Sequence, residues 1–406
     1  MTFVILNRLS WFRATFLTVL LLLCFTSVAW ADDIEQDKPN PLELELTEPD
    51  PLLPKLPVER PLTESEREKV RLALDELDKQ ALAQLEAGNV PAAFEIWYRE
   101  IRLRRKIGGP IEEVQALGRV GEIAWQDNRK PQLQLILARL ETIEQEAETE
   151  GNLDLPLLVA LGQAYGKIRV PGQALIVYEK VLAQARTRED AEAIEATLQT
   201  MASLHMAWFD YPKAAAAYEE LLDIAQLQGD SLKEFNYLKE LAYIYDQAKE
   251  PENALRYKQK ILETYLPEDP RRPELKIAIA SDYETLGQLD EASKTYQEAY
   301  TLAFSLKQFA YAADALRKLA SLYSSHQQPE FALQVYETLL EVEQFSYNYY
   351  GLMYAYDQIG QINLQLKDYG KALVAFEKGL ELAQSLKYQE SYFVTQIEQV
   401  KQQNVQ

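Results

Sequence analysis

Residues of the types that carry out chemistry are few in this chain. Among 406 residues there are two histidines, His205 and His326, and one cysteine, Cys24. A metal site needs several converging ligands, and no such set is seen at a suitable spacing. The sequence also lacks a nucleophile-elbow motif beside either histidine and a glycine-rich loop that could cradle a phosphate. We expect no enzyme, no metal and no cofactor, and keep Ser-His-Asp catalysis at His326 as the last alternative.

The charge of the chain argues against a nucleic-acid partner. It carries 42 Lys and Arg against 63 Asp and Glu, which gives a formal net charge of −21. Nucleic-acid binding depends on clustered basic residues that neutralise phosphates. An acidic surface is consistent with a soluble protein and indicates nothing more specific.

Residues 1–31 have the layout of an export signal. Their only charges are Arg8 and Arg13, an apolar run follows, and Ala29-Trp30-Ala31 supplies the small residues of a cleavage site. We expect a Sec-type signal peptide cleaved after Ala31, with periplasm, thylakoid lumen and secretion all open as destinations. The alternative is an uncleaved signal anchor. Cleavage would remove Cys24 and leave a chain without thiols, which suits an oxidising compartment.

Residues 32–62 form an acidic segment that holds seven of the chain's 18 prolines. This density excludes helix and central strand, so we expect an extended tether between the signal and the folded body. The alternative is a docking peptide for a partner. Folding is expected to begin at Thr63, because Thr63 and Glu66 have the spacing of a capping box ahead of a helical pattern.

The elements that would position any site recur about every 40 residues. Equivalent prolines follow one another at intervals of 40, 40, 41, 39 and 78 residues: Pro91, Pro131, Pro171, Pro212, Pro251 and Pro329. Leu289 and Tyr369 stand at equivalent places without proline. Proline is tolerated in the first turn of a helix, where its missing N–H has no intrahelical partner, so each proline is expected to start a helix. A fixed period of this length indicates a repeat protein.

Small and large residues form columns within the repeats. The column before each proline is Ala or Gly throughout: Ala81, Gly121, Gly162, Ala202, Ala242, Ala280, Ala320 and Gly360. The column after it is Ala93, Leu133, Ala174, Ala214, Ala254, Ala292, Ala332 and Ala372. Four residues later come Trp97, Leu137, Tyr178, Tyr218, Lys258, Tyr296, Tyr336 and Phe376. Small residues beside large rings predict two closely packed antiparallel helices per repeat. His205 lies three residues after Ala202, where other middle repeats have Tyr165, Tyr245, Tyr283 and Tyr323, so we expect it in the core.

These columns resemble the tetratricopeptide repeat (TPR), whose first helix carries Leu-Gly/Ala-x-x-Tyr and whose second carries Ala-x-x-x-Tyr/Phe. "LGQAYGKIRVPGQALIVYEKVL" matches well, and the resemblance covers roughly residues 63–389. It implies an all-α fold, a right-handed superhelical solenoid of about eight antiparallel helix pairs over residues 63–390. Residues 391–406 would be a C-terminal capping helix or tail. The period near 40 departs from the family's usual 34, and the first two repeats are degenerate.

In that family the first helices of the repeats line a concave groove that binds a protein or peptide. The matching positions here are Lys239, Tyr243, Asp246, Ser281, Glu284, Arg317, Ser321, Tyr350, Tyr354, Asp357 and Gln361. Tyr347, Tyr350 and Tyr354 share one helical stripe, and tyrosines with polar tips are typical interface anchors. Tyr347 and Tyr350 could instead seal the last contact between repeats, whereas Tyr349 and Tyr356 are expected to be packing residues.

The basic run from Arg99 to Lys106 contrasts with the acidic chain. It ends a predicted helix before Gly108-Gly109-Pro110, where cations complement the helix dipole. The alternative is contact with an anionic partner, either lipid headgroups or an acidic protein. Apart from an uncleaved signal anchor, this run is the only membrane contact that we expect.

The sequence thus predicts a non-catalytic, exported scaffold or adaptor that binds a protein or peptide and aids the assembly of an envelope or membrane complex. The alternative is a structural homo-oligomer formed through the solenoid ends. Its pairing surface would be the apolar face of the C-terminal helix, at Tyr392, Phe393, Ile397 and Val400. We favour a capping role for that helix.

Overall fold

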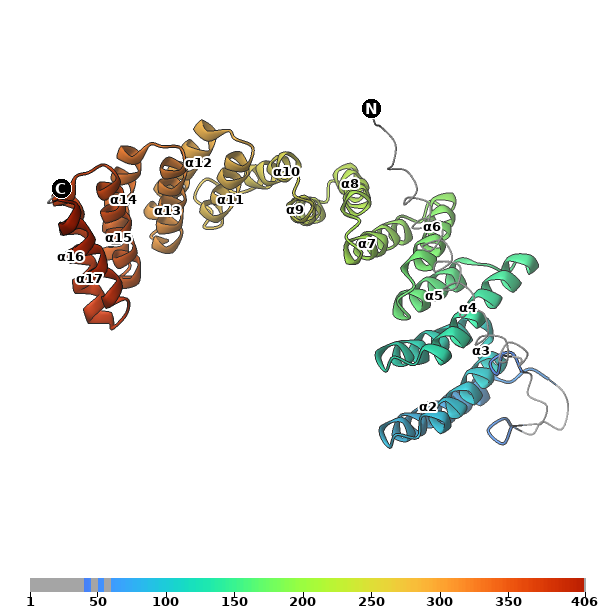
Figure 1. Cartoon of the computed structure of the whole chain (residues 1–406). Coiled ribbons are helices and arrows are strands. Elements are labelled where there is room, and N and C mark those ends of the chain that lie inside the picture. Colours follow the sequence, from blue (N-terminus) through green and yellow to red (C-terminus); the bar gives the residue numbers. More distant parts are fainter. Residues whose placement is uncertain (1–39, 45–49, 55–59, 405–406) are drawn as a thin grey trace, which may run out of the picture. The chain divides into compact units, whose positions relative to one another are not determined.

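The computed structural model describes residues 40–44, 50–54 and 60–404 (Figure 1). The expected signal peptide and its cleavage site lie outside these residues. Every regular element in the described part is a helix, and no strand occurs there. The helices are α2 (Glu64–Glu86), α3 (Val90–Gln126), α4 (Lys130–Glu150), α5 (Leu155–Lys167), α6 (Pro171–Thr187), α7 (Ala191–Ala207), α8 (Tyr211–Gln228), α9 (Ser231–Ala248), α10 (Pro251–Thr264), α11 (Arg272–Thr285), α12 (Leu289–Ser305), α13 (Phe309–Ser325), α14 (Pro329–Phe345), α15 (Tyr349–Gln365), α16 (Tyr369–Leu386) and α17 (Glu390–Gln403).

The chain forms two compact units, residues 1–188 and residues 189–406. The helical part of unit 1 consists of α2 to α6. Unit 2 contains five consecutive pairs, from α7/α8 to α15/α16, followed by α17. Within each unit, helices that follow one another in sequence pack together (Figure 1). The expected all-α solenoid of antiparallel helix pairs is confirmed.

The helix α3 consists of two helical arms joined by a kink. Gly109 has a φ of 69°, a left-handed conformation that glycine adopts without strain, and Pro110 follows it. The first arm therefore ends at Gly108-Gly109, and the second arm begins at Pro110. The first arm pairs with α2 and the second with α4, so unit 1 contains three pairs.

Local sequence signals explain where the helices begin. Thr63 and Glu66 make the expected capping box: the Thr63 hydroxyl accepts from the Glu66 N–H, and the Glu66 carboxylate accepts from the Thr63 N–H at 2.8 Å. Each of the six repeating prolines lies in the first turn of a helix, as expected. Pro171 in particular is the first residue of α6.

The packing columns form the core of both units. All eight residues of the column before the prolines are buried, and so are seven of the eight in the column after them, with Leu133 partly buried. A Cβ at Gly162 would lie 2.8 Å from the ring of Tyr178, and one at Gly360 would lie 2.5 Å from the ring of Phe376. The small residues therefore make room for the rings of the second helices.

The last helix, α17, covers the end of unit 2. Phe393, Ile397 and Val400 are buried and belong to one cluster with Phe376 and Ala383 of α16. These three residues were the main candidates for pairing between solenoid ends. Their burial within the chain removes them from any surface that could pair two copies.

Candidate functional site

The predicted groove residues all lie in unit 2, on the first helices of four successive pairs. The helix α9 supplies Lys239, Tyr243 and Asp246, and α11 supplies Ser281 and Glu284. Arg317 and Ser321 come from α13, and Tyr350, Tyr354, Asp357 and Gln361 come from α15. Spacings of three and four residues place each set along one side of its helix.

Five of these side chains are exposed: Lys239, Tyr243, Ser321, Tyr350 and Tyr354. Two further exposed tyrosines flank α15 and α16. Tyr347 precedes α15 with a φ of 55°, so the prediction that it shares a helical stripe with Tyr350 and Tyr354 is wrong, and Tyr388 follows α16. The rings of Tyr350 and Tyr388 meet edge to face, 5.8 Å apart, and the Tyr354 ring lies 6.3 Å from that of buried Tyr336. We call Tyr347, Tyr350, Tyr354 and Tyr388 the tyrosine patch. Tyr350 is 54% exposed and Tyr347 is 78% exposed. Even if both residues help to seal the last contact between repeats, much of each side chain stays accessible to a partner.

Three of the charged candidates, Asp246, Glu284 and Arg317, bond to other side chains of the chain. Asp246 accepts from Lys258 at 2.7 Å, and Glu284 accepts from the hydroxyl of Tyr296 at 3.0 Å. Arg317 donates to buried Glu343 at 2.7 Å. Each contact comes from the next helix along the chain, 12 or 26 residues away, and depends on which side chains face each other there, which the repeat pattern did not reveal.

The C-terminal helix also uses part of the predicted groove. The Tyr392 hydroxyl of α17 donates to Asp357 at 2.9 Å, and Gln361 donates to Tyr392 and to Gln396 at 3.0 and 2.9 Å. The prediction that Tyr349 is a packing residue is wrong, because its side chain is 51% exposed. Of the eleven predicted groove residues, the exposed ones are therefore three tyrosines, Lys239 and Ser321.

Lys258 replaces the aromatic residue that the other repeats of unit 2 place in the same column. Its side chain is buried, and its ammonium donates to Asp246 at 2.7 Å and to Asp282 at 2.8 and 3.1 Å. Asp282 is itself buried, and burial raises its pKa although the Lys258 ammonium opposes that shift. One lysine thereby joins α9, α10 and α11 where a ring would otherwise pack.

Glu219 of α8 organises two tyrosines beside this region. Its carboxylate accepts from Tyr257 at 2.6 Å and from Tyr245 at 3.1 Å, and the two rings stack 5.6 Å apart. Burial, with Glu219 adding to it, raises the pKa of Tyr245 to about 12 and raises that of Tyr257 as well. Burial also raises the pKa of Tyr237 to about 12, with a contribution from its bond to Glu195.

These tyrosines predict that unit 2 loses stability in alkali. Their folded-state pKa values exceed the value near 10 of an unfolded tyrosine, so their stabilisation is complete below about pH 10 and is lost as the pH rises through about 12. We expect the thermal midpoint, measured by circular dichroism, to fall steeply between these values. Replacing Tyr245 with phenylalanine should reduce the fall. If absorbance showed every tyrosine of the folded chain ionising near pH 10, this expectation would be wrong.

The histidines show no catalytic arrangement. His205 is buried as expected, with Nδ1 3.5 Å from an Asp210 oxygen. His326 is exposed, and its Nδ1 lies 2.8 Å from the Leu322 carbonyl and 3.1 Å from the Ser325 hydroxyl. Within residues 40–44, 50–54 and 60–404, no group of three or more His, Cys, Asp or Glu could hold a metal ion.

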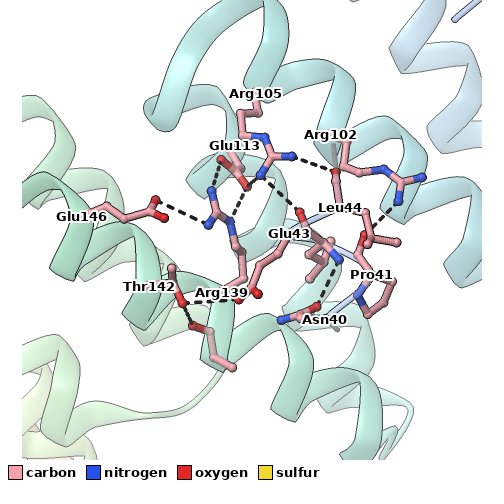
Figure 2. Close-up of polar contacts among 12 residues, drawn as sticks. Asn40, Pro41, Glu43, Leu44, Arg102, Arg105, Glu113, Arg139, Thr142 and Glu146 are labelled. Atoms are coloured by element: carbon pink, nitrogen blue, oxygen red, sulfur yellow. Dashed lines mark hydrogen bonds and ion pairs between the residues drawn. The ribbon is translucent and has the colours of Figure 1, made fainter. Parts of the chain in front are cut away.

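The basic run on α3 has a use that neither sequence hypothesis included. Arg102 donates to the carbonyl of Pro41 at 2.8 Å, and Arg105 donates to the carbonyls of Leu42 and Leu44 at 3.3 and 3.1 Å (Figure 2). Arg99 donates two hydrogen bonds, of 2.7 and 2.8 Å, to the carboxylate of Asp50. The arginines hold the chain's own N-terminal segment.

At these positions the structure differs from the free tether that proline content suggested. We call residues 40–44 and 50–54 the N-terminal strap. Leu42 is fully buried, Asp50 is buried, and Leu52 and Leu53 pack on a core cluster shared by α2 and α3. The proline-rich sequence excludes helix and sheet but leaves turns whose carbonyls are free to accept from arginine.

No helix within the described residues is long and apolar enough to cross a membrane. The sequence-based alternative of a signal anchor concerns residues outside that part.

Comparison with known proteins identifies the repeats. Family models described as tetratricopeptide repeat match residues 157–192, 273–306 and 354–386. The chain therefore contains TPR repeats, a class whose members generally mediate protein–protein interaction and are typically non-catalytic. No match was found among curated proteins.

Several solved structures are similar to this chain. BtubC from P. vanneervenii is 20% identical, with 53% of this chain and 92% of that chain covered and a TM-score of 0.37. For a MamA protein the identity is 19%, the coverage 47% and 92%, and the TM-score 0.34. The C-terminal part of a TPR repeat-containing protein from Cytophaga hutchinsonii is 13% identical, with 65% of this chain and 95% of that chain covered and a TM-score of 0.38.

Proposed function

We propose that this chain is a non-catalytic scaffold that binds a protein partner through the tyrosine patch of unit 2. We further propose that it acts in an exported compartment and aids the assembly of an envelope or membrane complex. The observation that carries the proposal is the exposure of Tyr347, Tyr350, Tyr354 and Tyr388 on neighbouring helices and loops of the last two pairs.

The chemistry of the patch suits a protein partner. A tyrosine offers a large apolar ring at a small cost in side-chain entropy, and its hydroxyl can bond a partner's polar groups. Tyr350 is braced by Tyr388, and Tyr354 by Tyr336, so these rings are held in place before binding. Preorganised aromatic anchors are the residues that most often dominate binding energy.

Export rests on the sequence. The layout of residues 1–31 supports a Sec-type signal, and the absence of cysteine after Cys24 suits an oxidising compartment. A Sec-type signal leads to the periplasm, the thylakoid lumen or secretion. A surface that binds one protein while the chain is retained near a membrane would serve assembly.

The test is capture of the partner in the cells that make the protein. A tagged chain is crosslinked with an amine-reactive reagent, purified and analysed by mass spectrometry. We expect one dominant partner, with crosslinks at exposed Lys387 beside Tyr388, and an N-terminus at Asp32. Self-crosslinks alone would contradict the scaffold and favour the homo-oligomer, while an N-terminus before Asp32 would contradict cleavage after Ala31.

Alanine at both Tyr350 and Tyr354 is expected to weaken this capture about tenfold or more, because anchor tyrosines commonly contribute a large share of binding energy. Tyr349→Ala is the matched control, since it lies on the same helix with similar exposure but outside the patch. Circular dichroism verifies that all variants keep their helices. Equal capture by the double variant and the control would exclude the tyrosine patch.

A further inference from the structure

The two halves of the N-terminal strap repeat one turn. In Asn40-Pro41-Leu42, the Asn40 side-chain oxygen accepts from the Leu42 N–H at 3.1 Å and its carbonyl accepts from the Glu43 N–H at 2.9 Å. In Asp50-Pro51-Leu52, the equivalent bonds are 2.9 and 3.0 Å, to Leu52 and Leu53. Asn and Asp favour such turns because the side chain replaces a backbone acceptor, and proline presets the backbone that follows. Each half is therefore an Asx-Pro-Leu turn.

Both turns dock on the same stretch of α3. Arg102 and Arg105 bind main-chain carbonyls of the first turn, whereas Arg99 binds the carboxylate that begins the second. The helix α4 contributes the carbonyl of Leu135, which accepts from the Asn40 amide at 2.9 Å. We call Arg99, Arg102, Arg105 and the Leu135 carbonyl the arginine surface.

The contacts define what the arginine surface recognises. The contacts with main-chain carbonyls depend on the path of the backbone. The contacts with the Asn40 amide and the Asp50 carboxylate depend on the residue type at the first position of each turn. The leucines provide the apolar component, since Leu42 is fully buried and Leu52 packs against the core cluster of α2 and α3 that contains Val70 and Leu103. The ligand of this surface is thus an extended chain that carries Asx-Pro-Leu turns.

Two of the three arginines on this surface meet strap carbonyls and, among the described residues, no strap carboxylate. Within the described residues Arg99 has a strap carboxylate, but Arg102 meets a carbonyl, and its buried Nε has no hydrogen-bond partner there. Arg105 lies 3.6 Å from Glu113, which is already bonded to Arg139 (Figure 2). A carboxylate bonds a guanidinium more strongly than a carbonyl does, so a more acidic peptide would fit Arg102 better than the strap does.

We propose that the arginine surface is a binding site for an acidic segment with an Asx-Pro-Leu turn in a partner protein, and that the strap is its competitor within the chain. This site belongs to unit 1 and does not depend on the tyrosine patch. A competitor tethered in the same chain acts at a high effective concentration. The apparent affinity for a partner is therefore the intrinsic affinity multiplied by the fraction of sites that the strap leaves open. The strap therefore sets a threshold for binding.

The test uses the full chain and a labelled synthetic peptide with the sequence of residues 38–54. Leu42→Ser with Asp50→Asn removes the buried leucine and the carboxylate held by Arg99, which should release the strap. By fluorescence anisotropy this variant is expected to bind the peptide at least about tenfold more tightly than the wild-type chain does, because its sites are open. Leu72→Ser, at a residue of α2 that is 63% exposed and lies outside the strap and the arginine surface, is the matched control and should behave as wild type.

Charge reversal identifies the surface that binds the peptide. Adding Arg102→Glu and Arg105→Glu to the released variant should abolish peptide binding. If the released variant keeps wild-type helicity and binds no more tightly than wild type, the proposal is overturned. If it loses helicity, Asp50→Asn alone, which preserves size, replaces it under the same criterion.

Other occupants give different results. Dimers of the wild-type chain that disappear with Leu42→Ser would assign the surface to the strap of a second copy and overturn the proposal of a partner segment. Binding of anionic vesicles but not of the peptide by the released variant would overturn it as well. Failure of the Tyr350 and Tyr354 variants would leave this proposal unaffected, so the two sites are tested separately.

Discussion

Replacement of Lys258 by methionine is expected to destabilise unit 2 by about 3–5 kcal/mol. Lys258 and Asp282 are both buried, and their ion pair of 2.8 Å spans α10 and α11. Removing the lysine leaves the Asp282 carboxylate in an apolar environment without its counter-charge. Asp246 would suffer less, because its side chain is 42% exposed and can be hydrated.

Urea denaturation followed by circular dichroism measures this effect. Lys260→Met is the control, because Lys260 lies on the same helix but is exposed, and it should change stability by less than about 0.5 kcal/mol. A second substitution separates lost charge from lost packing: Lys258→Met with Asp282→Leu replaces both partners by apolar residues and should recover most of the loss. If Lys258→Met matched its control, the pair would not contribute to stability.

Alanine at Gly360 is expected to destabilise unit 2 by about 1–3 kcal/mol, although alanine favours a helix by about 1 kcal/mol over glycine. The added methyl would lie 2.5 Å from the ring of Phe376. That ring is fully buried and cannot move aside without displacing its neighbours. Steric overlap therefore reverses the sign that helix propensity alone would give.

The control for this substitution lies in the next helix of the same unit. A Cβ at Gly370 would have Asp368 Oδ1 at 3.8 Å as its nearest neighbour, an ordinary contact. Gly370→Ala should therefore be neutral or stabilise the unit by up to about 1 kcal/mol. Thermal melts of the two variants should shift in opposite directions or leave Gly370→Ala unchanged. A Gly360→Ala variant as stable as wild type would contradict the role assigned to the small-residue column.

The fold could be read from the sequence because its determinants are local. Capping at Thr63, prolines in first turns and small residues facing rings act within one helix or between neighbouring helices. A repeat protein reuses these short-range rules along its length, so that the pattern predicts each helix pair separately. The same reasoning placed His205 in the core. It also identified Lys258 as an exception to the aromatic column, but not the two aspartates that it binds.

The candidate site was predicted only in part. The exposure of Tyr243, Tyr350 and Tyr354 agrees with their expected position on the first-helix face. Five of the polar candidates have partners within the chain; Arg317 bonds Glu343, 26 residues away, and Asp357 bonds Tyr392, 35 residues away. Which polar groups meet depends on the register between helices, and residue types at a fixed period do not specify that register.

The sequence by itself determined the class of fold, the start of the second helix in each pair that carries a repeating proline, and the residues that form the core. The tertiary structure decided what the polar residues do, and the basic run shows this most clearly. Arg102 and Arg105 read as cations at a helix end, yet they bind carbonyls 61 and 63 residues away. A proline-rich segment without helix or sheet carries no periodic signal. Its place on the protein became visible only when the arginines of one folded unit lay close enough to bond it.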